Sequence, residues 1–196
     1  MAWESRLSAE RPDLDLVPEW RYDEDICLAE TPIFTLRQRR GTSPSDPANT
    51  GRFVYLDCPD WVNVIALTAE REVVAIEQCR HGLAEVTLEI PGGMVDPGES
   101  PFEAGIRELR EETGYEGELA RTIGSVSPNP AILNNHCYTV LVENARRATS
   151  PALDANEEIA VRLISLDQIA GLIRAGAIHH ALVVAAFHHL ALQGDA

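Results

Sequence analysis

The segment GGMVDPGESPFEAGIRELREETGY, residues 92–115, decides the fold because it combines a glycine turn with one short, acidic helix. Ser100 is a good N-cap, Pro101 suits the first helical position, and Glu103 completes a capping box with Ser100. Gly114 can adopt the left-handed conformation that ends a helix. The local sequence therefore predicts a helix that starts at Pro101 and stops before Gly114.

Three glutamates lie close together on this helix, which is unfavourable unless something offsets their repulsion. Glu108 and Glu112 are one turn apart, Glu111 lies beside them, and like charges at this spacing lower helix stability. A divalent cation would offset the repulsion, and carboxylate oxygens are the donors that Mg²⁺ and Mn²⁺ prefer. The pattern predicts a site for Mg²⁺, with Mn²⁺ possible; a solvated acidic helix face is the alternative.

The same segment resembles the Nudix box. That family's pattern is Gly, five residues, Glu, seven residues, Arg-Glu, an apolar residue, any residue, Glu-Glu, any residue, Gly and an apolar residue. The matching positions here are Gly93, Glu99, Arg107, Glu108, Leu109, Glu111, Glu112, Gly114 and Tyr115. Tyr115 departs from the pattern, because its ring is half-polar where an aliphatic residue is usual, but it can still pack.

The resemblance implies a hydrolase that cuts the diphosphate of a nucleoside diphosphate linked to another group. The metal ligands that it implies are the Gly92 carbonyl, Glu108, Glu112 and, for a second ion, Glu111. Arg107 and Glu99 would pair and brace the loop at Gly93 onto the helix, which orients the ligands without touching the metal.

Two segments outside the box resemble ADP-ribose pyrophosphatases and nucleoside diphosphate sugar hydrolases. The segment EQCRHG, residues 77–82, resembles a Glu-Gln-Tyr-Arg segment of those enzymes. Arg80 would then contact the diphosphate or the terminal ribose; a solvated arginine at a strand end is the alternative. Pro130 has the offset from the box that accompanies this class. Asn134 and Asn135, in the same loop, would bond sugar hydroxyls or diphosphate oxygens, or serve only the turn.

The segment from Asp154 to Ile159 resembles the mobile acidic loop of ADP-ribose pyrophosphatases, in which a glutamate outside the box deprotonates the attacking water. By position Glu157 is that base, with Glu158 as its substitute. Glu111 is a further candidate, but a carboxylate beside metal ions has a low pKa and accepts protons poorly. A loop carboxylate acquires a pKa nearer the working pH when it is desolvated. An exposed acidic turn is the alternative.

The order of the predicted elements indicates an α/β protein. Strands, one helix, more strands and then two helices favour a mixed sheet covered by helices. The last helix is predicted over residues 178–192. The resemblance implies the Nudix α/β/α sandwich with a mixed β-sheet and an N-terminal β-extension. We expect residues 1–51 to form that extension and residues 52–196 to form the hydrolase domain.

The N-terminal extension has too few apolar residues for a core of its own, although Trp20 and the run from Ile33 to Leu36 need burial. In the ADP-ribose pyrophosphatase class, such a segment forms strands that embrace a partner subunit and complete its nucleoside pocket. The resemblance therefore implies a homodimer.

The tail carries two histidine pairs nine residues apart, His179–His180 and His188–His189. On one continuous helix this spacing places the pairs on different sides. We therefore expect histidines of the surface or of a subunit contact rather than metal ligands.

Whole-chain properties narrow the partners. A formal net charge of −15 and a pI of about 4.7 argue against nucleic-acid binding. No apolar run reaches membrane-spanning length, and no hydrophobic core of a signal peptide is seen. The four cysteines lack paired spacing, as is usual in a reducing compartment. We therefore expect a cytoplasmic enzyme with a small-molecule substrate and no membrane partner.

Two alternatives to hydrolysis of ADP-ribose or of a nucleoside diphosphate sugar remain. One is a Nudix pyrophosphatase for another nucleoside diphosphate derivative, a dinucleoside polyphosphate or coenzyme A. The other is a non-catalytic Nudix ligand sensor. Sensors typically lose box carboxylates and carry a DNA-binding extension, whereas this chain keeps every carboxylate and has no basic C-terminal module.

Overall fold

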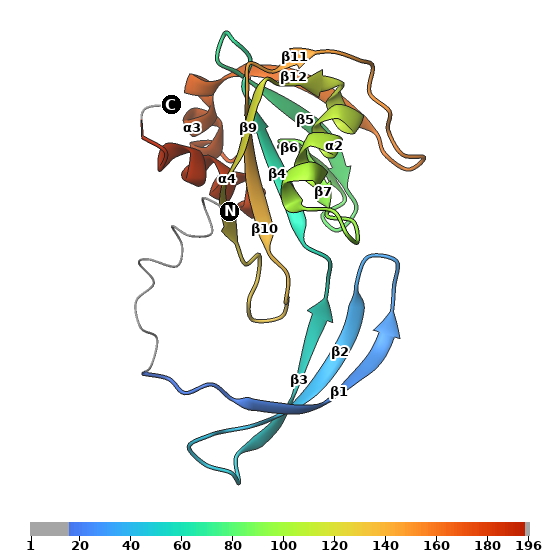
Figure 1. The fold of residues 1–196 in the computed structure, drawn as a ribbon, viewed down its shortest axis with the longest axis vertical. Coiled ribbons are helices and arrows are strands. Elements are labelled where there is room, and N and C mark those ends of the chain that lie inside the picture. Colours follow the sequence, from blue (N-terminus) through green and yellow to red (C-terminus); the bar gives the residue numbers. More distant parts are fainter. Residues whose placement is uncertain (1–15, 195–196) are drawn as a thin grey trace. The chain divides into compact units, whose positions relative to one another are not determined.

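The computed structural model describes residues 16–194 and divides into two compact units. The extension unit runs to Pro59 and also includes Ser127–Asn135, and the main unit contains the rest, from Asp60 onward. The extension unit holds strands β1 to β3, and the main unit holds the remaining strands and the described helices (Figure 1). None of the described helices is long and apolar enough to cross a membrane.

The main unit is built on a mixed four-stranded sheet in the order β7-β4-β10-β9. Its two central strands run parallel, and the outer strands are antiparallel to them. The bounds are β4 (Trp61–Ala66), β7 (Gly92–Met94), β9 (Leu119–Val126) and β10 (Cys137–Glu143).

A second, antiparallel sheet of the main unit has the order β12-β5-β6. Its strands are β5 (Glu72–Arg80), β6 (Glu85–Glu89) and β12 (Ile159–Ser165). A two-stranded ladder joins β8 (Tyr115–Glu116) to β11 (Arg146–Arg147).

Helices cover both faces of the mixed sheet. Helix α2 (Pro101–Thr113) lies on one side of β4 and β10, and α3 (Leu166–Arg174) and α4 (Ala181–Ala191) lie on the other (Figure 1). Alternate residues of β4 serve the two faces: Val62 and Val64 belong to the core under α2, and Ile65 to the core under α4. The predicted α/β/α sandwich with a mixed sheet is confirmed.

Helix α2 begins and ends where its local sequence predicts. The Ser100 side chain accepts a hydrogen bond from the Glu103 backbone, and the Glu103 carboxylate accepts one from the Ser100 backbone. Gly114 has φ 73°, and a Cβ there would lie 2.2 Å from the carbonyl oxygen of Thr149. Position 114 therefore requires glycine for two reasons. The turn is left-handed, and the backbone of Thr149 approaches too closely for a side chain.

The extension unit is an antiparallel sheet of β1 (Arg21–Glu30), β2 (Thr35–Thr42) and β3 (Thr50–Asp57). Strand β3 pairs with β2 along its full length and belongs to this unit, whose N-terminal part runs to Pro59. Residues 1–15 of the expected extension lie outside the described residues.

The tail does not form the single helix expected over residues 178–192. Helix α4 starts at Ala181, and His180 is its N-cap in extended geometry, so His179 and His180 precede the helix. His180 and His189 are partly buried, whereas His179 and His188 are exposed. The ring of His189 packs so closely on β9 that a Cβ on Gly124 would lie 2.4 Å from it.

Candidate active site

The glycine turn places the box carboxylates against the backbone of β7. The Glu108 carboxylate approaches Gly93 so closely that a Cβ at that position would lie 2.3 Å from Oε1. Glu112 is 2% exposed, and its Oε2 accepts a hydrogen bond of 3.0 Å from the backbone N–H of Gly92. The two glycines therefore allow two carboxylates of α2 to lie directly under the turn.

Arg107 ties the loop to the helix through hydrogen bonds to four residues. Its Nε and Nη2 donate to the two carboxylate oxygens of Glu99, at 3.1 and 2.9 Å. Its Nη1 donates to Glu108 at 2.8 Å and to Glu111 at 3.1 Å, and Nη2 also reaches the Met94 carbonyl. Hydrogen bonding to Glu99 is the main cause of a raised pKa of Arg107. Arg107 therefore stays charged and fixes both the loop and Glu108.

Burial leaves the two inner carboxylates short of countercharge. It raises the pKa of Glu112 to about 8, since the bond from Gly92 offsets only part of the desolvation and the nearby charges of Glu108 and Glu157 add to it. Burial also raises the pKa of Glu108, although Arg107 acts in the opposite sense. A bound cation would stabilise the ionised form of both groups.

The donor set fits a hard divalent cation. Within residues 16–194, no three side chains of His, Cys, Asp or Glu are grouped closely enough to hold a metal by themselves. Glu111 is turned toward Arg107 and is 46% exposed. Glu108, Glu112 and the Gly92 carbonyl would hold the ion, with water filling the other positions, as Mg²⁺ commonly requires.

Arg80, at the end of β5, is held by a buried carboxylate of the neighbouring strand. Its Nε and Nη2 donate to Glu89 at 2.8 and 2.6 Å. The charges of Glu112 and Glu157 also act on Arg80, which places it near the box carboxylates. Sequence reasoning did not single out Glu89; the available signal was a charged residue between the apolar residues Leu88 and Ile90, at the end of β6.

Glu89 stays ionised although it is buried. Burial would raise its pKa, but the hydrogen bonds from Arg80, His180 and Thr87 together hold the pKa far below its ordinary range. Thr87 Oγ1 donates at 2.6 Å, and the His180 ring nitrogen Nδ1 lies 2.8 Å away. Every lone pair direction that a carboxylate commonly uses is thus engaged.

Of the two loop glutamates, Glu157 is the one that interacts electrostatically with this centre. It is partly buried, and its charge acts on Glu108, Glu112 and Arg80. It also closes a turn, since its carboxylate accepts from the Asp154 N–H at 3.0 Å. Glu158 is exposed.

Pro130, Asn134 and Asn135 belong to the extension unit. Asn134 accepts from the Cys58 N–H at 3.0 Å and donates to Asp57 at 2.7 Å. Asn135 is buried and donates to the Pro59 carbonyl at 2.8 Å. These amides fasten the loop to the end of β3, whereas Pro130 is exposed.

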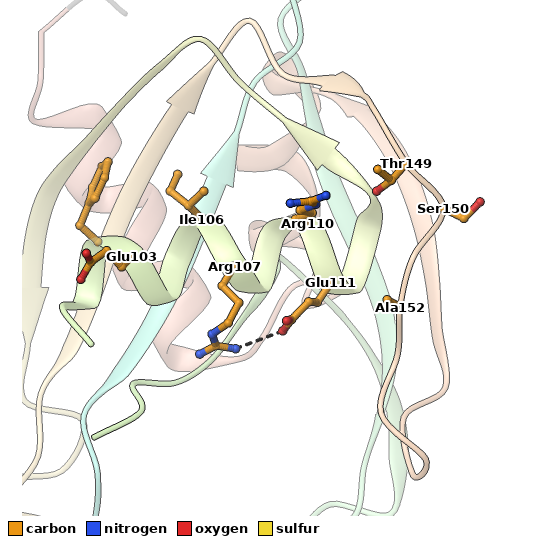
Figure 2. A pocket seen from close by; sticks show the side chains of 9 residues that line it. Glu103, Ile106, Arg107, Arg110, Glu111, Thr149, Ser150 and Ala152 are labelled. Carbon is orange, nitrogen blue, oxygen red and sulfur yellow. Dashed lines mark hydrogen bonds and ion pairs between the residues drawn. The ribbon is translucent and has the colours of Figure 1, made fainter. Parts of the chain in front are cut away.

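A cavity of about 650 Å³ runs along the outer side of α2. It is bounded by the helix and by the segment Thr149–Ala152 (Figure 2). Among the residues of the acidic centre, Arg107 and Glu111 line it, and Figure 2 shows the ion pair between them. Neither Glu108 nor Glu112 lines it.

A family comparison explains this arrangement of glycines, arginine and carboxylates. The model of the NUDIX domain matches residues 59–187, which include the whole centre. The chain belongs to the Nudix family. The match of this Nudix protein to the family model begins at Pro59, directly before the first residue of the main unit, Asp60.

Several relatives of this Nudix protein are pyrophosphatases. It is 28% identical to "ADP-ribose pyrophosphatase" of Bacillus subtilis over 136 residues, 69% of this chain and 74% of the relative. It is 32% identical to "Methanol dehydrogenase activator" of Bacillus methanolicus over the same shares. A solved "ADP compounds hydrolase" has the same fold, with a TM-score of 0.80 at 19% identity, covering 92% of this chain and 98% of the other. The predictions of the family and of a pyrophosphohydrolase are confirmed at this level.

Substitution of Glu112 tests two effects of this side chain, its contribution to metal binding and its contribution to the stability of the metal-free fold. In metal-free protein, the folded state keeps a proton on Glu112 up to about pH 8, whereas the unfolded state releases it above about pH 4.5, so wild type loses stability as pH rises between these values. Glu112→Gln lacks this loss. We expect the free energy of unfolding of Glu112→Gln to be higher than that of metal-free wild type by roughly 1–4 kcal/mol at pH 8, and by less at pH 5.

Urea unfolding with and without Mg²⁺ measures both effects. Mg²⁺ should stabilise wild type and leave Glu112→Gln unchanged. Glu111→Gln, which alters a more exposed carboxylate, is the matched control and should keep the wild-type pH dependence. A Glu112→Gln protein that gains as much stability from Mg²⁺ as wild type would remove Glu112 from the metal site.

Proposed function

We propose that this protein hydrolyses the diphosphate bond of ADP-ribose or of a nucleoside diphosphate sugar in a Mg²⁺-dependent reaction. The products would be a nucleoside monophosphate and a sugar phosphate. The observation that carries the proposal is the pair of carboxylates beneath the Gly92–Gly93 turn, Glu112 buried and Glu108 partly buried, with an arginine beside it. The named activity of the Bacillus subtilis relative supports the choice of substrate.

Arg80 and Glu157 would have different roles in the reaction. Arg80 would contact the diphosphate, because it is fixed near the carboxylate centre and is 39% exposed. Glu157 would take a proton from the water that attacks phosphorus, while the bond from phosphorus to the leaving phosphate oxygen breaks. The divalent cation, when bound, supplies neutralisation of the diphosphate oxygens and a lowered pKa of water.

A substrate panel tests the reaction. We expect release of a monophosphate from ADP-ribose or from at least one nucleoside diphosphate sugar with Mg²⁺, and no release after chelation of the metal. A dinucleoside polyphosphate and coenzyme A belong in the panel, because preferential cleavage of either would favour the alternative pyrophosphatase. Absence of any hydrolysis, together with ligand binding, would favour a sensor or a role like that named for the Bacillus methanolicus relative.

Glu157→Gln tests the base. Loss of a general base typically lowers kcat by about 10²–10⁴-fold, and metal affinity should remain close to wild type because Glu157 is not among the proposed ligands. Glu158→Gln is the matched control, since its exposed side chain lies next in the same loop. If Glu158→Gln or Glu111→Gln loses activity while Glu157→Gln stays within a few-fold of wild type, the assignment to Glu157 is wrong.

The homodimer is part of the same proposal, with the extension unit as its contact surface. Every residue of β1 is exposed, and this unit also exposes large apolar side chains. The exposed apolar residues of the unit's strands are Tyr22, Ile26, Leu28, Phe53 and Val54. A sheet with such an edge and face is commonly covered by a second chain.

Charge on this surface should separate the subunits. We expect Ile26→Asp with Leu28→Asp to raise the dimer dissociation constant at least 100-fold, since burial of each side chain contributes about 1.5–3 kcal/mol. Leu83→Asp is the control, because Leu83 is exposed in the main unit. Light scattering at micromolar concentration gives the mass; a monomeric wild type would refute the dimer.

A further inference from the structure

Glu89 joins three segments of the main unit at one buried carboxylate. Oε1 accepts from Arg80 Nε and from Thr87, and Oε2 accepts from Arg80 Nη2 and bonds His180 Nδ1. Arg80 comes from β5, Thr87 from β6, and His180 from the start of α4. The side chain of Glu89 is 1% exposed, so water cannot replace a lost partner easily.

This pairing leaves one edge of the Arg80 guanidinium for an anion. Nε and Nη2 are used by Glu89, while Nη1 has no hydrogen-bond partner among the residues that the structure describes. The charges of Glu112 and Glu157 act on the same guanidinium. The orientation of the Glu89 carboxylate therefore decides where the open edge of Arg80 points.

His180 is the partner of Glu89 that comes from outside the β5–β6 pair. Its Nδ1 and Arg80 Nη2 share the same oxygen of Glu89. As the N-cap of α4, His180 makes no side-chain bond to its own helix; the ring is directed to Glu89 instead. Its neighbour His179 reaches Glu85, 3.1 Å away, and takes no part in the cluster.

We propose that His180 is a positioning residue for the reaction, which acts through Glu89 to aim Arg80 at the diphosphate. This inference rests on the proposed function, since Arg80 is the group that would contact the substrate. Without the bond from His180, Oε2 loses one of its two partners, and the carboxylate can turn together with the guanidinium that it holds. Arg80 would bind the diphosphate in the ground state and in the transition state alike. Removal of the His180 bond should therefore raise mainly KM.

Two amide substitutions distinguish a specific bond from general packing. Asparagine places its amide nitrogen near the position of Nδ1, whereas glutamine places it near Nε2. We expect His180→Gln to raise KM about tenfold with kcat within threefold of wild type, the loss typical of one hydrogen bond to a charged group. His180→Asn should restore KM to within about threefold of wild type. His179→Ala is the matched control and should behave as wild type.

Inorganic pyrophosphate provides a readout that does not need turnover. Calorimetry with Mg²⁺ should show pyrophosphate binding about tenfold weaker to His180→Gln than to wild type or to His180→Asn. In an Arg80→Ala background, His180→Gln should have no further effect, because the residue through which it acts is gone. Equal melting temperatures of the Asn and Gln variants would show that both fold.

The outcomes separate this inference from the reaction itself. Unchanged pyrophosphate affinity in His180→Gln overturns the role of His180, even if wild type hydrolyses ADP-ribose. The same is true if His180→Asn is as weak as His180→Gln, or if the effect persists without Arg80. A wild type that hydrolyses no member of the panel overturns the proposed reaction, while the pyrophosphate series still decides the link between His180 and Arg80.

Discussion

Glu108 and Glu112 have to remain close together in a place from which water is largely excluded, and the main unit is organised around that constraint. Each partner offsets a different part of the unfavourable energy. Arg107 supplies countercharge to Glu108, the Gly92 N–H supplies a hydrogen bond to Glu112, and Gly93 leaves the space that the carboxylate fills. The balance is incomplete, as the raised pKa of Glu112 shows, and a cation is the group that would complete it.

The parts of the fold that follow from neighbouring residues could be predicted from the sequence. The bounds of α2 are correct because Ser100, Glu103 and Gly114 act on the backbone within one turn of the residues that they cap. A strand such as β10 is predictable for a similar reason, since its apolar side chains are contiguous. Strand β1 was not, because its residues are exposed and carry no core-facing pattern.

The cluster around Glu89 could not be predicted because it depends on contacts between distant residues. The antiparallel register of β5 and β6 brings Arg80 and Glu89 onto one face, and only the late start of α4 frees His180 to reach them. An unbroken helix from residue 178 would turn that histidine elsewhere. The loop with Asn134 and Asn135 poses the same difficulty, since its amides bond residues that precede the main unit in the chain.

The parallel pairing of β4 with β10 also has a consequence for the order of folding. It joins Trp61 to Cys137, so the mixed sheet has a high contact order and cannot close until the chain is made as far as β10. Helix α2 is synthesised before that point, while two residues of the core on which it packs, Val140 and Val142, are still missing. On the ribosome, therefore, the acidic helix should first exist as a capped but undocked segment, and the active site should assemble in one late step.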